Sequence, residues 1–78
     1  MTKIIGLLYN DNLKIFVYNN GLQVEGKKCT LDNCAKTIAM FAEVYNVNII
    51  NLIGDSQLSQ IIGKELKNKY SLKTSEMI

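Results

Sequence analysis

The residues best placed to do chemistry in this chain are four consecutive ones, Gly54, Asp55, Ser56 and Gln57. They follow an apolar run of strand length and precede a helical pattern. Because the free N–H groups at the start of a helix bind anions, these residues are a candidate site for a nucleotide or another small anionic ligand. The competing interpretation is structural: Gly54 makes the turn and Asp55 or Ser56 caps the helix. An acid at this position repels phosphate, so the sequence favours capping.

Carboxylates suggest a second chemistry, metal-dependent hydrolysis. Asp11, Asp32 and Asp55 are the acids considered for this role, and Asp55 directly follows an apolar run. One well-placed ligand does not make a two-metal site. The chain also has no His, the commonest general base and metal ligand. We therefore predict no metal, no cofactor and no enzymatic activity.

The two cysteines, Cys29 and Cys34, are expected to be reduced and partly buried. Cys34 falls in the first turn of a predicted helix, where the helix dipole favours a thiolate, so a reactive thiol is the alternative. So few cysteines, together with an N-terminus unlike a signal peptide, predict a cytoplasmic protein. No apolar run approaches the ~18–20 residues that a membrane span requires.

All nine basic residues are lysines, and the net charge is only +2. Arg is the preferred residue for bidentate contacts to phosphate and guanine, so its absence makes nucleic acid an unlikely partner by composition. One group of lysines lies toward the C-terminus: Lys64, Lys67, Lys69 and Lys73. We interpret this group as a solvated helix face, and a weak patch for nucleic acid or an acidic protein is the alternative.

The pattern of apolar residues predicts the elements that position these groups. Strands are expected at residues 3–9, 13–18, 22–29 and 47–53, and helices at 31–45 and 57–70. Asn20 and Gly21 favour a type I′ hairpin turn. Thr30 is the expected cap of the first helix, and Asn46 its left-handed stop. Residues 71–78 are polar and are expected to fray.

These elements predict a single small α/β domain spanning residues 1–78. Their order is β-β-β-α-β-α, with two helices. The first three strands form an antiparallel meander, and the fourth is added parallel through a right-handed crossover. The first strand is apolar on both faces, so we place it centrally, between the second and fourth strands.

This order resembles the first half of the ribonuclease H-like and actin-like superfold. The resemblance implies metal-binding carboxylates in the nucleases, one of them in the first strand, but residues 4–8 contain no acid. Asp55 fits a second ligand position, and Asp32 or Glu43 fits a position on the first helix. The actin-like relatives imply an acid with glycines at residues 10–12, where only the acid is present. The resemblance thus implies a version of the fold that lacks its catalytic motifs.

Two helices do not easily cover both faces of a four-stranded sheet. If both pack on one face, either Ile5, Leu7, Phe16 and Tyr18 or the alternate residues of the same strands form an apolar patch on the other. Such patches usually mark an interface. We therefore expect a partner to cover the sheet, either a second copy in a two-fold homodimer or another protein.

A non-catalytic interaction protein, in the form of a homo-oligomer that binds another macromolecule, is the function that we rank first. Small size and a composition rich in Asn, Lys and Ile resemble small phage proteins, some of which inhibit host or defence machinery. A protein that binds a nucleotide or small anion, at residues 54–57 or in the cleft of a dimer, is the first alternative. A degenerate ribonuclease H-like module associated with nucleic acid is the second.

Overall fold

Seven elements follow one another in the computed structural model, which describes residues 1–10 and 12–77. They are β1 (Thr2–Tyr9), β2 (Asn12–Asn19), β3 (Leu22–Cys29), α1 (Cys34–Tyr45), β4 (Ile49–Gly54), α2 (Ser56–Tyr70) and β5 (Lys73–Met77). The first six confirm the predicted order β-β-β-α-β-α.

The strands form one mixed sheet in the order β3-β2-β1-β4-β5. The pairs β1–β2 and β2–β3 are antiparallel, whereas β4 runs parallel to both β1 and β5. β1 is therefore an inner strand, as its apolar character on both faces predicted. The β2–β3 hairpin turns at Asn20 and Gly21, whose φ values of 53° and 85° are the positive angles of a type I′ turn.

The expectation that residues 71–78 fray was wrong for most of this segment, because β5 (Lys73–Met77) pairs in parallel with β4. Residue 78 lies outside the described residues. Ser71 ends α2 in the left-handed conformation, with φ 56°, and turns the chain back along the sheet. Leu72 then packs against the core, and its N–H donates to the carbonyl oxygen of Leu66 at 3.1 Å. β5 is a polar strand at the edge of the sheet, and its sequence therefore resembles that of a disordered tail.

The start of α1 also differs from the prediction. The helix begins at Cys34 after Asn33, and not after Thr30. The Thr30 N–H donates to the side-chain oxygen of Asn33 at 3.0 Å, which holds a turn ahead of the helix. The end of the helix agrees with the prediction, since Asn46 adopts the left-handed conformation with φ 55°.

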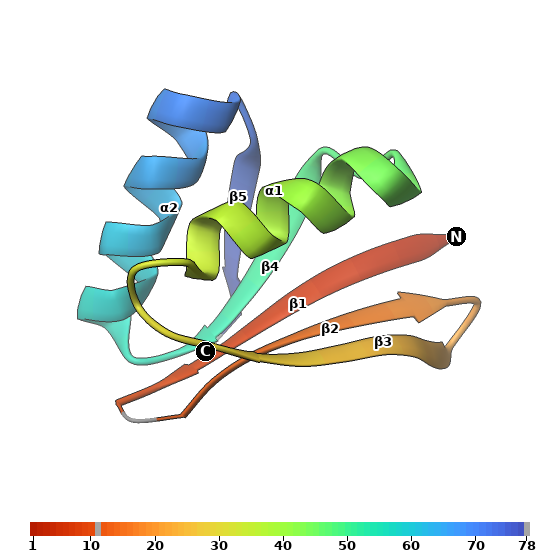
Figure 1. Cartoon of the computed structure of the whole chain (residues 1–78), viewed down its shortest axis with the longest axis horizontal. Coiled ribbons are helices and arrows are strands. Elements are labelled where there is room, and N and C mark those ends of the chain that lie inside the picture. Colours follow the sequence, from red (N-terminus) through yellow and green to blue (C-terminus); the bar gives the residue numbers. More distant parts are fainter. Residues whose placement is uncertain (11, 78) are drawn as a thin grey trace.

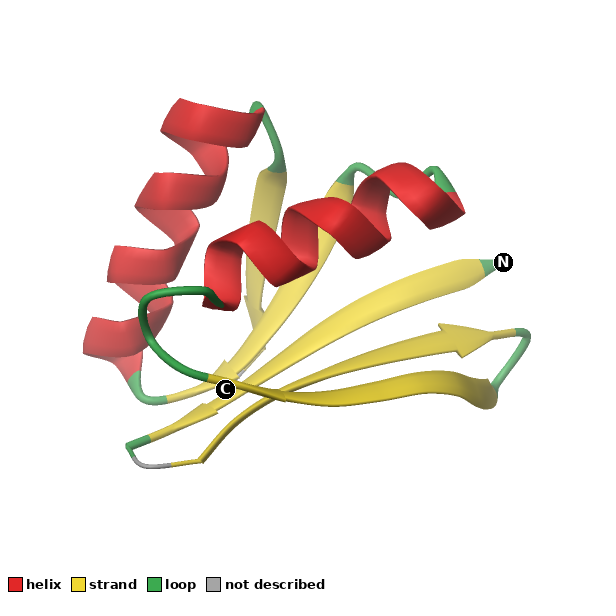
Figure 2. Ribbon diagram, viewed as in Figure 1, coloured by secondary structure: helices red, strands yellow, loops and turns green. Residues whose placement is uncertain are grey.

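Both helices cover the same face of the sheet (Figures 1 and 2). Between the sheet and this helical layer lies the core, built from alternate residues of the strands and the inner sides of the helices. Its largest fully buried side chains are Ile4, Leu8, Ile15, Ile38, Ile50, Leu52, Ile62 and Leu66. Within the described residues, no element covers the opposite face, which we call the open face (Figure 1).

Candidate functional site

The turn between β4 and α2 contains the four residues that the sequence singled out. Gly54 has a φ of 122°, and a Cβ atom at this position would lie only 2.2 Å from the carbonyl oxygen of Leu8. The Asp55 N–H donates to that same oxygen at 2.7 Å. Only glycine lets the chain pass so close to β1, and this explains the residue type in structural terms.

Asp55 is the N-cap of α2. Its Oδ1 atom accepts hydrogen bonds from the N–H groups of Gln57 at 2.9 Å and Leu58 at 3.1 Å. Ser56 and Gln57 are exposed. Two of the free donors at this helix start are therefore satisfied by the chain's own carboxylate, which supports the capping interpretation.

The described acids that we considered for a metal site do not form a cluster. Among the described residues, no group of three or more His, Cys, Asp or Glu side chains could hold a metal ion. Asp32 lies in the turn before α1, and Asp55 bonds to α2. Asp11 lies outside the described residues.

The Cys34 side chain is fully buried at the start of α1, and Cys29 is half-buried nearby in β3. Burial, with smaller contributions from Cys29 and Glu65, raises the pKa of the Cys34 thiol from 9.0 to about 12. A group with this pKa is a thiol at neutral pH, whereas the nucleophile is the thiolate. Cys34 is thus a core residue and not a reactive one.

The four residues of the predicted apolar patch do lie together on the open face. Ile5 is directly opposite Phe16 across the β1–β2 pair, and Leu7 and Tyr18 lie two residues away along their strands. On the other side of β1, Leu7 is paired with Ile53 of β4. The four patch side chains and that of Ile53 are half-buried, since only their neighbours in the sheet shield them from solvent.

Lysines border this patch on both sides along the strands. Lys3 is opposite Tyr18, and Lys14 is opposite both Leu7 and Lys28. Lys73, on the edge strand β5, is opposite Ile49 of β4 and lies in the same cross-strand row as Lys3. Within the described part of the sheet, these cross-strand rows contain no Asp or Glu.

Sequence reasoning missed this arrangement, although part of its signal was present. Lys3 alternates with Ile5, and Lys14 with Phe16, so each pair lies on one face of its strand. Lys28 and Lys73 join them only because of the strand order, which brings β3 and β5 to the two edges.

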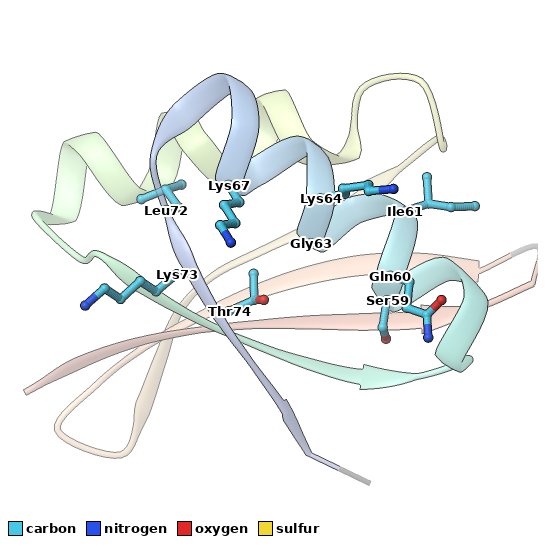
Figure 3. Close-up of a pocket in the computed structure, with 9 residues that line it drawn as sticks. All are labelled: Ser59, Gln60, Ile61, Gly63, Lys64, Lys67, Leu72, Lys73 and Thr74. Carbon is cyan, nitrogen blue, oxygen red and sulfur yellow. The ribbon is translucent and has the colours of Figure 1, made fainter.

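A groove of about 860 Å³ lies between α2 and β5, at the β5 edge of the sheet (Figure 3). Lys64 and Lys67 of α2 line it together with Lys73 and Thr74 of β5. Gly63 brings the two elements close, because a Cβ atom there would lie 3.3 Å from the Thr74 hydroxyl oxygen. This groove contains three of the four lysines that the sequence grouped, and Lys69 does not line it.

No helix of the described chain is both long and apolar enough to span a membrane. No family model and no curated protein matches the sequence.

Comparison with solved structures found a protein of Bacteroides thetaiotaomicron that is described as having an actin-like ATPase fold and unknown function. It superposes with a TM-score of 0.71 at 17% sequence identity. The match covers 97% of this chain but only 32% of the other, so the chain spans about a third of that protein's length. The similarity shows that this chain has part of an actin-like fold, in agreement with the predicted resemblance.

Proposed function

We propose that this chain is a non-catalytic interaction protein whose open face binds an anionic macromolecule. One observation carries the proposal: an apolar centre at Ile5, Phe16 and their neighbours is bordered by lysines on both sides, with no acid in the described open-face rows that hold these lysines.

The apolar centre supports binding because no described element covers it. Burial of apolar surface contributes roughly 25 cal/mol per Å². A contiguous apolar area rimmed by polar groups is the usual mark of an interaction surface. The half-buried rings of Phe16 and Tyr18 belong to the residue types that are enriched at such surfaces.

The charge pattern supports an anionic partner over a second copy of the chain. In a two-fold contact through the open face, the same surface meets itself, so Lys3, Lys14, Lys28 and Lys73 of one copy approach those of the other. Juxtaposed like charges are costly, whereas a negative surface is attracted. Self-association through this face, in the homodimer expected from the sequence, is therefore less favoured than binding of an anionic partner.

Retention on immobilised heparin, a generic polyanion, tests the proposal. The double variant Lys3→Glu/Lys14→Glu removes two lysines from the open face, and Lys64→Glu/Lys67→Glu removes two from the α2–β5 groove. Both variants have the same net charge. We expect the open-face variant to elute at a clearly lower salt concentration than the groove variant.

Equal shifts for the two variants would show that retention follows net charge alone, and would contradict the proposal. Light scattering on the eluting wild-type protein supplies a second check. A monomer is expected, whereas a dimer that dissociates in the Phe16→Lys variant would assign the open face to self-association instead.

A further inference from the structure

We infer that the open face binds single-stranded nucleic acid, by stacking bases on its aromatic rings and contacting phosphates with its lysines. This inference rests on the proposed function, because it names the anionic macromolecule that the same face binds.

Two aromatic rings lie close together on the open face. Phe16 and Tyr18 project from the same face of β2, with ring centroids 6.4 Å apart. Tyr9 of the adjacent β1 lies on this face as well and is half exposed, but it is opposite Asn12, beyond the row of Lys14, and is not part of this pair. Side-by-side aromatic rings on an uncovered sheet are the arrangement that sheet-type RNA-binding domains use to stack two or three bases.

The lysines occupy the positions that phosphates need. Lys3 and Lys73 lie in one cross-strand row, and Lys14 and Lys28 in a row beyond the apolar centre. Phe16 and Ile5 form the row between them. A single-stranded nucleic acid whose bases stack on the apolar centre can therefore contact lysines with its phosphates on either side. This combination is typical of sequence-tolerant single-strand binding.

The absence of arginine limits the kind of nucleic acid that this face fits. Bidentate reading of base edges relies on Arg, Asn and Gln in the major groove of a duplex. Stacking and simple phosphate contacts do not require Arg, since lysine binds phosphate as a point charge. The inferred ligand is therefore single-stranded and is bound with little sequence preference.

The rings also separate this ligand from an acidic protein. An acidic peptide is attracted by the lysines but gains nothing specific from the planar face of Phe16 or Tyr18. Base stacking depends on that face, so removing the rings while keeping their bulk distinguishes the two partners.

The test is fluorescence anisotropy of a labelled twelve-nucleotide oligo(dT) with the full chain at low salt. We expect saturable binding, which the double variant Phe16→Leu/Tyr18→Leu weakens at least tenfold, because each lost stacking contact costs several-fold in affinity. The Leu side chains retain apolar bulk, and circular dichroism checks that the variant is folded. Val44→Ala, on the exposed side of α1, is the matched control and should bind as the wild type does.

Salt dependence adds a second readout. Lys14→Gln should reduce the slope of log affinity against log salt by about 0.7, the value for one phosphate contact to a single strand. A duplex of the same length, whose bases are already stacked and paired, should bind more weakly than oligo(dT) at equal salt.

Wild-type affinity in the Leu variant, or equal affinity for the duplex, would overturn the inference. If heparin is retained through the open face but oligo(dT) does not bind, the inference fails while the proposed function stands. If neither polyanion binds through this face, both fail.

Discussion

Gly54 and Asp55 illustrate how one short motif serves the fold at the scale of single residues. The glycine passes within contact of the Leu8 carbonyl, and the carboxylate satisfies two N–H groups of α2. A phosphate at this helix start would compete with Asp55 for the same donors and would meet its negative charge.

Replacement of Asp55 tests this assignment. Asp55→Ala should lower the free energy of unfolding by about 1 kcal/mol, the usual cost of a lost N-cap, whereas Asp55→Asn should retain most of the stability because Asn caps equally well. Urea denaturation measures both. A thermal shift of the wild type by ATP or GTP that Asp55→Ala abolishes would instead assign a ligand to this turn.

Cys34 predicts a pH dependence of stability. Its pKa is raised in the folded state, so the native protein holds the thiol proton more tightly than the unfolded chain. The stabilisation is fully present below about pH 9 and is lost as the pH rises toward about 12. Other groups titrate in this range, so Cys34→Ala is the reference.

The free energy of unfolding of the wild type should fall more steeply than that of Cys34→Ala between these pH values. Parallel curves for the two proteins, measured by urea denaturation at several pH values, would contradict the burial of this thiol.

At the scale of elements, local sequence signals predicted the order of strands and helices well. The Asn20–Gly21 turn, the left-handed Asn46 and the two apolar faces of β1 each have a local cause that the sequence displays. The expected open face followed from counting helices against strands. The sequence did not determine which alternate residues it carries, and in the structure these are Ile5, Leu7, Phe16 and Tyr18.

β5 and the start of α1 could not be predicted in this way. β5 forms because β4 has an unpaired edge and because α2 ends at a point from which the chain can return to that edge. Both conditions depend on the tertiary structure and not on the local sequence. Thr30 is a good N-cap residue by type, but Asn33 uses its side chain to close a turn there instead. The basic border of the open face likewise depends on which strands become edges.

Hydrogen exchange tests whether β5 pairs with the sheet. The Lys73 N–H donates to the Asn48 carbonyl oxygen at 3.1 Å, and alternate residues of a strand point the same way. The amide of Ser75 should therefore be protected while that of Thr74, which points away from β4, exchanges faster. Equally fast exchange of the two amides, measured by NMR, would contradict the pairing.

At the scale of the whole molecule, the main feature is an asymmetric sheet. One face is sealed by α1 and α2, and the other combines apolar, aromatic and basic side chains without an acid in its described rows. The α2–β5 groove is a second basic surface, with Lys64 and Lys67, but none of the described residues that line it is aromatic. Single-stranded nucleic acid would therefore contact different residues on each of the two surfaces.

NMR mapping of the amide groups of the isotope-labelled protein during titration with oligo(dT) decides between these surfaces most directly. We expect the largest shifts on β1 and β2, at residues such as Ile5, Phe16 and Tyr18, while amides of the outer side of α2 change little. Shifts confined to Lys64, Lys67 and their neighbours, or no shifts at saturating oligonucleotide, would contradict this expectation.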